Sequence, residues 1–84
     1  MTPNEQIESY AKKRAISIIK RARELSGNNG RNIIKCLEAS ITTYYMGLRS
    51  QISASTKHGI MLIIEALQTV CEHIAAACTA KEAA

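Results

Sequence analysis

Residues 22–34 read ARELSGNNGRNII, and this stretch decides the fold. Its centre, Gly27 to Gly30, holds two glycines and two asparagines, which adopt positive φ and turn the chain more readily than other residues. On both sides of this turn, apolar residues recur at intervals of three and four, the spacing of one face of an α-helix. The stretch therefore predicts two helices joined by a tight turn at residues 27–30.

The helix before the turn has a clear start. Thr2 can cap the helix, Pro3 suits its first turn, and Glu5 can return a hydrogen bond to the cap. We therefore predict a helix from about residue 3 to residue 26. Its apolar seam is expected to consist of Ile7, Ala11, Ala15, Ile18, Ala22 and Leu25.

The chain after the turn predicts two further helices, at about residues 31–51 and 57–79. Between them, residues 49–59 are poor in apolar side chains and rich in Ser and Thr, which favours a turn at about residues 52–56. One continuous helix is the alternative, because no proline interrupts this part of the chain. The inward residues are expected to be Ile33, Ile34, Leu37, Ile41, Tyr44, Tyr45, Leu48 and Ile52, followed by Ile60, Ile63, Ile64, Leu67, Val70, Cys71, Ile74 and Cys78.

These elements predict a single all-α domain of residues 1–84, either an antiparallel helical hairpin or a three-helix bundle. A chain of 84 residues lies near the size at which one core is marginal and self-association supplies additional burial. Ile16, Met61 and Leu62 project away from the predicted seams, so they are expected to be exposed and to form an interface with another copy or a partner. We therefore expect a homo-oligomer.

Three cysteines, an odd number with no signal peptide ahead of them, favour reduced thiols and a cytoplasmic protein. The longest apolar run, residues 59–64, is much shorter than the roughly 20 residues that cross a bilayer. The expectation from this run is that the protein has no membrane segment and no membrane partner.

No catalytic or metal-binding pattern is visible. The chain has no Asp, and its seven Glu are scattered without a close pair, which disfavours acid–base catalysis. Cys71 and Cys78 lie two helical turns apart, and His73 points to nearly the opposite side, so one metal ion cannot bind all three. We expect neither an enzyme nor a metal or other cofactor.

The charge of the chain is uneven. Residues 1–35 hold eight of the eleven Lys and Arg but only three Glu, while the rest of the chain is slightly acidic. Along one edge of the first helix, arginines lie next to the apolar seam, an arrangement that suits contacts to phosphate. Arg31 follows the turn, whose backbone N–H groups can also receive an anion. The residues expected to bind the ligand are Tyr10, Lys13, Arg14, Ser17, Lys20, Arg21 and Arg31.

A solvated helix face is the alternative for these cations, with Glu8–Lys12 and Lys20–Glu24 pairs along the helix. Two functions follow from the pattern. The first is a binder of a phosphate-bearing ligand, either a signalling nucleotide or nucleic acid. The second is an adaptor or inhibitor that docks on a partner protein through an apolar helix face, with the charges steering an acidic partner.

Two short segments resemble a known family. Residues 6–10, QIESY, and residues 59–62, GIML, with Ala66, resemble small helical-hairpin proteins by which phages sequester cyclic oligonucleotide signals of bacterial immunity. The resemblance implies an oligomeric, non-enzymatic sponge in the host cytoplasm that binds its ligand between protomers. Tyr10 is the residue to which it gives a ligand-binding role.

Overall fold

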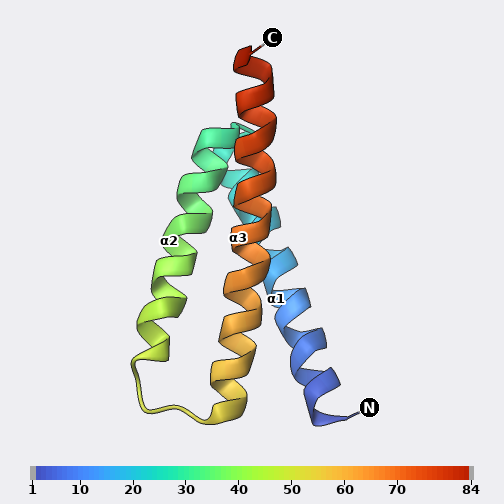
Figure 1. The fold of residues 1–84 in the computed structure, drawn as a ribbon, viewed down its shortest axis with the longest axis vertical. Coiled ribbons are helices and arrows are strands. Elements are labelled where there is room, and N and C mark those ends of the chain that lie inside the picture. The colour runs from blue at the N-terminus through green and yellow to red at the C-terminus, as the bar shows by residue number, and fades with distance from the viewer. Residues whose placement is uncertain (1, 84) are drawn as a thin grey trace.

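The computed structural model describes residues 2–83, with side chains described over residues 2–80, and it consists of three helices. These are α1 (Pro3–Ser26), α2 (Gly30–Leu48) and α3 (Ala54–Ala83). All three pack against one another, which confirms the predicted all-α class and selects the three-helix bundle over the two-helix hairpin. Figure 1 shows α3 between α1 and α2, which lie near each other at the turn of residues 27–29 and diverge toward the opposite end.

The ends of α1 follow from local hydrogen bonds. The Thr2 hydroxyl accepts a hydrogen bond from the Glu5 backbone N–H at 3.2 Å, and the Glu5 carboxylate accepts one from the Thr2 backbone N–H at 3.4 Å. This reciprocal pair is the predicted capping box. At the other end, Gly27 has a φ of 57° and its N–H binds the carbonyl oxygen of Arg23. A left-handed residue at this position ends the helix, as the sequence predicts.

The second turn lies three residues earlier than expected. The helix α2 ends at Leu48, and the loop of residues 49–53 excludes the alternative of one continuous helix. Of the Ser and Thr residues in this stretch, Ser53 caps α3, because its hydroxyl accepts a hydrogen bond from the Thr56 N–H at 3.2 Å, so the helix begins at Ala54 rather than at about residue 57. The helix also continues to Ala83 instead of ending at residue 79, since its alanine-rich end keeps a high helix propensity.

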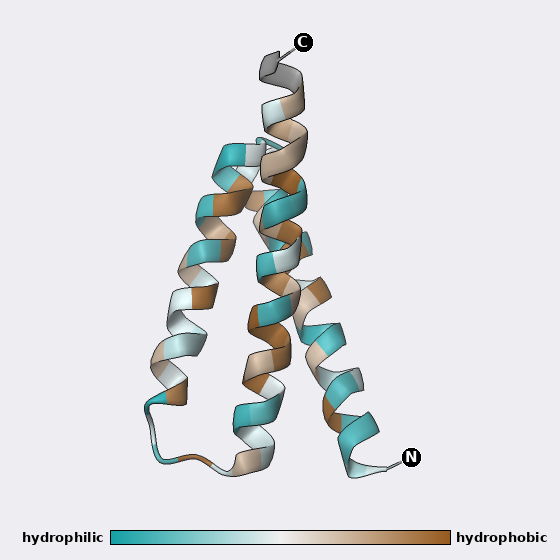
Figure 2. Ribbon diagram, viewed as in Figure 1, coloured by the Kyte–Doolittle hydropathy of each residue, from teal (hydrophilic) through white to brown (hydrophobic). Residues whose placement is uncertain are grey.

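The buried core is aliphatic and unequally shared. It consists of Ala11, Ala15, Ala22, Ile33, Leu37, Ile41, Ile63, Ile64 and Leu67. Thus α1 supplies only alanines, whereas α2 and α3 supply the large side chains. In Figure 2, accordingly, much of α1 near the N-terminus is hydrophilic, while the middle of α3 is strongly apolar.

Three positions differ from the predicted seams, namely Leu25, Tyr45 and Leu62. Tyr45 was expected to face inward, but it is 44% exposed at the border of α2 and α3. Leu25 is 70% exposed rather than packed, because the packed face of α1 centres on its alanines and Leu25 lies at the border of that face. Leu62 was expected to be exposed, but it is half-buried and packs against the core. The reason is that α3 contacts both other helices, so its packed face is broader than theirs.

By length and composition alone, α3 over Ala54–Ala80 could cross a membrane, the one helix among the described residues of which this is true. The longest uninterrupted apolar run underestimates this length, because alanines and cysteines extend the apolar character of the helix. This is weak evidence for a membrane protein, since the core helix of a soluble protein passes the same test. In this structure α3 supplies Ile63, Ile64 and Leu67 to the core, while 17% of its most apolar window is buried inside the bundle.

Gly30, the first residue of α2, lies directly against α3. A methyl group on Gly30 would lie 2.7 Å from Cys78 Sγ and 3.2 Å from Ile74 Cγ2. We therefore expect Gly30→Ala to lower the free energy of unfolding by about 1–2 kcal/mol through overpacking. Most of this loss should disappear in a Cys78→Ala background, where the obstructing sulfur is absent. Urea unfolding followed by circular dichroism measures both differences, and an equal loss in the two backgrounds would contradict the contact.

Leu37 and Leu25 provide a matched test of the core. Leu37 is fully buried, so Leu37→Ala should lower the free energy of unfolding by about 3 kcal/mol. Leu25→Ala removes the same atoms from an exposed position and should change it by less than about 0.5 kcal/mol. The same urea titration compares the two variants, and a large effect of Leu25→Ala would restore Leu25 to the core.

Candidate functional site

A groove of about 530 Å³ opens where the three helices diverge. Its lining residues are Pro3, Gln6, Ile7, Tyr10, Arg14, Tyr44, Ser55, Thr56, Gly59, Ile60 and Ile63. The floor is thus the first three turns of α3, and the walls are the first half of α1 and Tyr44 of α2. We call this site the Tyr10–Tyr44 groove.

Gly59 has no side chain, so at this position the floor of the groove is the backbone of α3. A Cβ atom at this position would meet Ile7 Cγ2 at 3.5 Å, which is ordinary van der Waals contact. Ile7 therefore lies against the α3 backbone, and α1 approaches α3 closely without filling the space between Tyr10 and Tyr44. An apolar floor with a few polar groups at the rim is typical of small-molecule sites.

Arg14 is the one charged residue that lines the groove. Its Nε donates a hydrogen bond to the hydroxyl oxygen of Tyr44 at 3.2 Å, which ties α1 to α2. This hydrogen bond is the main cause that raises the pKa of Arg14, so the guanidinium is charged at every physiological pH. Within the described residues Arg14 makes no other polar contact, so its terminal nitrogens are available to a ligand.

Two helix N-termini add to this positive site. Pro3 at the start of α1 and Ser55 and Thr56 at the start of α3 all line the groove. The N-terminal end of a helix carries a partial positive charge. Pro3 has no backbone N–H and the Thr56 N–H already donates to Ser53 Oγ, so these ends act through this charge. Together with Arg14, these ends favour an anion in the groove.

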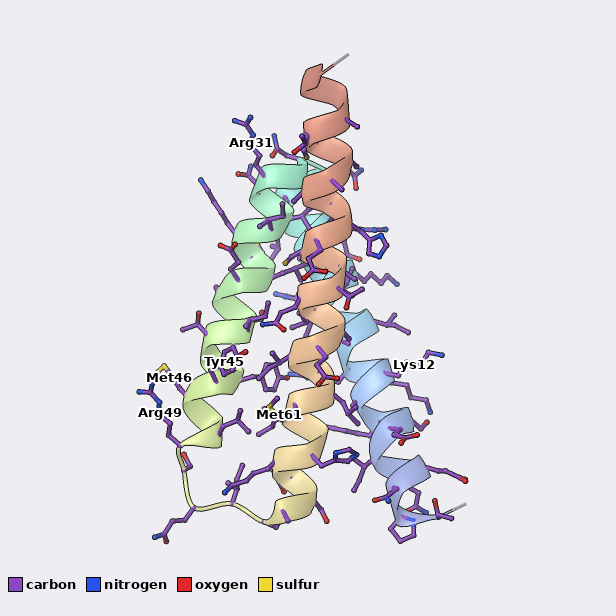
Figure 3. All side chains as sticks on the ribbon, in the orientation of Figure 1. Lys12, Arg31, Tyr45, Met46, Arg49 and Met61 are labelled. Atoms are coloured by element: carbon purple, nitrogen blue, oxygen red, sulfur yellow. The ribbon has the colours of Figure 1, made fainter. Side chains whose placement is uncertain are left out.

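The structure separates the predicted ligand-binding residues. Tyr10 and Arg14 meet in the Tyr10–Tyr44 groove, but Lys13, Ser17 and Arg21 are exposed on α1 outside its lining. Lys20 lines a different hollow, together with Ile16. Arg31 lies at the start of α2, at the opposite end of the bundle (Figure 3).

Of the lining residues, sequence reasoning placed only Tyr10 and Arg14 in the ligand site, and it missed three with hydroxyl groups. Tyr44 was assigned to the apolar seam, and Ser55 and Thr56 to the second turn. The hydroxyl group of Tyr44 was the signal that could have identified it, because a polar group in a mostly aliphatic seam needs a hydrogen-bond partner. Its partner is 30 residues away in the sequence, so spacing along one helix could not reveal the contact.

The expected ion pairs along α1 do not form. Neither Glu8 with Lys12 nor Lys20 with Glu24 makes an ion pair in the part of the chain with described side chains. These residues are exposed to solvent. The cations of α1 therefore keep their charge available for partners.

The cysteines do not form a metal site. Among the described residues, no group of three or more His, Cys, Asp or Glu side chains could hold a metal ion. Cys36, Cys71 and Cys78 are free thiols, each half-buried. Burial, and then the negative charges of Glu38 and Glu72, raise the pKa of Cys71.

Comparison of the chain with protein-family models, curated proteins and solved structures found no match. The two segments that carry the resemblance to phage sponges nevertheless meet in the structure. Ile7 and Tyr10 of the first segment and Gly59 and Ile60 of the second line the same groove.

The raised pKa of Cys71 has a measurable consequence. The thiolate is the form of cysteine that reacts with iodoacetamide. At pH 8, Cys71 should therefore react at least about threefold more slowly in the folded protein than in urea. The fold favours the neutral Cys71 thiol. Cys71 therefore contributes to the stability of the fold at pH values below the pKa of its thiol in the unfolded chain, and this contribution is lost as the pH rises through the raised pKa of the folded protein. Peptide mapping by mass spectrometry gives the rate, and equal rates in the two states would contradict the shift.

Proposed function

We propose that the protein is a non-enzymatic binding protein that captures a small phosphate-bearing ligand in the Tyr10–Tyr44 groove. The observation that carries this proposal is the hydrogen bond between Arg14 and Tyr44, which holds a guanidinium at the rim of an apolar groove. An arginine fixed in this way loses little conformational freedom when it binds phosphate. The starts of α1 and α3 add partial positive charge beside it.

The groove favours a ligand that combines phosphate with a planar apolar part. Tyr10, which is 67% exposed, and Tyr44 provide aromatic surface on either side of Arg14. Aromatic rings stack on nucleobases, and this contact contributes about 1–3 kcal/mol per base. A signalling nucleotide supplies both parts.

The size of the groove favours a small ligand over duplex nucleic acid. A volume of about 530 Å³ lies within the usual range of small-molecule sites, roughly 300–1,000 Å³. The remaining cations of α1 lie outside the groove, so they do not converge on a single extended track for a nucleic-acid backbone. Nucleic acid is therefore the weaker choice of phosphate ligand.

The resemblance to phage sponges supports the same site. Tyr10, to which the resemblance gives the ligand-binding role, lies in the groove beside Arg14. A sponge in the cytoplasm holds its ligand without turning it over, so it needs no acid–base pair. In this form of the proposal the protein protects an invader by removing a nucleotide signal of host defence.

Arg14 and Arg21 provide the test. Both are exposed arginines of α1, one heptad apart, but only Arg14 lines the groove. Arg14→Gln should weaken binding of a nucleotide at least about tenfold, the loss of one charge-assisted contact, whereas Arg21→Gln should leave it within about twofold. Calorimetric titration with a cyclic dinucleotide, a nucleoside monophosphate and inorganic phosphate compares the variants and the ligands.

A second variant probes the orientation of Arg14. Tyr44→Phe keeps the ring but removes the hydroxyl that accepts the hydrogen bond from Arg14. It should weaken binding less than Arg14→Gln does. Equal losses for Arg14→Gln and Arg21→Gln would indicate general electrostatic attraction rather than binding in the groove. Failure of the wild-type protein to bind any of these ligands would overturn the proposal.

A second candidate function is docking on a partner protein. It is favoured by Ile16 and Met61, which are 56% and 39% exposed. The variants Ile16→Gln and Met61→Gln test this function, because each should weaken the binding of a partner protein to the chain. A partner protein that binds both variants as tightly as the wild type would count against it. Leu62 is unsuitable for such a test, because it packs against the core.

A further inference from the structure

The exposed apolar side chains Ile16 and Met61 lie on different faces of the molecule. Ile16 belongs to the α1 outer face, which we define as Lys13, Ile16, Lys20 and Arg23. Met61 belongs to the α2–α3 face, which we define as Glu38, Tyr45, Met61, Glu65 and Glu72. In Figure 3, Tyr45 and Met61 lie along the boundary of α2 and α3, whereas Lys12 marks α1 and points away from both other helices.

The α1 outer face is an apolar position surrounded by cations. Ile16 lines a shallow hollow of about 550 Å³ that only α1 and the following turn form. The other lining residues are Ile19, Lys20, Arg23, Glu24, Gly27 and Asn28. Lys13 precedes Ile16 by three residues and shares its side of the helix. This face therefore combines a small apolar centre with a net positive charge.

The middle of the α2–α3 face has the opposite charge, since it carries Glu38, Glu65 and Glu72. Tyr45 is 44% exposed, and its hydroxyl accepts a hydrogen bond from Gln68 Nε2 at 3.2 Å, which joins α2 to α3 across this face. Met61, Glu65, Gln68 and Glu72 recur at intervals of three and four, so they share one side of α3.

Glu38 lies seven residues before Tyr45 on the same side of α2. The charges of Glu38 and Glu72 both raise the pKa of Cys71, so a residue of α2 and a residue of α3 act on the same thiol. The cations Arg49 and Lys57 lie at the loop end of the face, and Arg31 and Lys35 precede Glu38 toward its other end, so the three carboxylates occupy the middle of the face.

The charges of both faces are available to a partner. None of the defining residues of either face makes an ion pair within the part of the chain with described side chains. Opposite charges around two apolar centres are the pattern that steers and orients protein association. The partner that the α2–α3 face fits is a helix with an exposed aliphatic residue among cations, and α1 of a second copy is such a helix.

We propose that two copies of the chain associate head to tail, with the α1 outer face of one copy docked on the α2–α3 face of the next. A symmetric dimer through either face alone would place like charges opposite each other, which disfavours it. The head-to-tail contact instead pairs lysines with carboxylates and Ile16 with Met61 and Tyr45. Each added copy leaves one face of each kind free, so the contact continues into a ring or a chain.

This association is independent of the proposed ligand site. Neither face includes Tyr10, Arg14 or Tyr44, which line the groove. Loss of ligand binding in Arg14→Gln should therefore leave self-association unchanged.

Two double variants with exposed substitutions test the contact. Ile16→Gln/Lys20→Gln disables the α1 outer face, and Met61→Gln/Glu65→Gln disables the α2–α3 face. Each variant alone should associate at least about tenfold more weakly than the wild type, which corresponds to about 1.4 kcal/mol. A one-to-one mixture should form a heterodimer and nothing larger, because each variant retains one competent face of the opposite kind.

Sedimentation velocity over a range of concentrations gives the masses, at low salt and at 0.5 M salt. The wild type should grow beyond a dimer at low salt and shrink at high salt, since salt screens the charges. Arg21→Gln/Leu25→Gln is the matched control, because it makes the same kinds of change outside both faces and should behave as the wild type.

Three outcomes would overturn the head-to-tail contact. One is a wild-type protein that stays monomeric at every concentration, which would leave the two faces to a different partner protein. Another is a dimer formed by either double variant alone, which would indicate a symmetric interface. The third is a mixture of the double variants that does not associate.

Discussion

The bundle depends on an unequal division of its core. The helices α2 and α3 bury isoleucines and leucines, whereas α1 buries only Ala11, Ala15 and Ala22. Small side chains let α1 approach its neighbours, and its larger apolar residues Ile18 and Ile19 are only partly buried, so burial holds α1 less strongly than it holds the other two helices. The contact of α1 with α2 is accordingly the least extensive in the bundle, and the two helices diverge toward the open end (Figure 1).

The groove and the charged faces follow from this division. Where α1 and α2 diverge, one hydrogen bond between Arg14 and Tyr44 spans them and leaves an apolar space above α3. A narrow packed face on α1 also leaves most of its circumference to solvent, and the cations occupy it. The helix α3, which is covered from two sides, keeps an exposed strip with Met61 and its carboxylates. Positive and negative surfaces therefore lie on different helices.

Local signals were the most reliable guide to the fold. The capping box of Thr2 and Glu5 and the left-handed Gly27 set the ends of α1 through contacts within four residues, so the sequence alone predicts them. The second turn was harder, because Ser53, Ser55 and Thr56 are all competent caps and only the chain geometry selects Ser53. Leu25 and Leu62 were misplaced for a related reason. Periodicity gives the direction of a helix face but not its width, which depends on how many helices cover it.

The sequence by itself determined three helices, an aliphatic core and a chain whose first part is basic, because these depend on local hydrogen bonds and residue type. Only the tertiary structure decided which polar residues meet. It brought Tyr44 to Arg14 and the start of α3 to Tyr10, and it sent Arg31 and Lys20 elsewhere. These relations join residues far apart in the chain, and the packing of side chains between helices, rather than spacing along one helix, sets them.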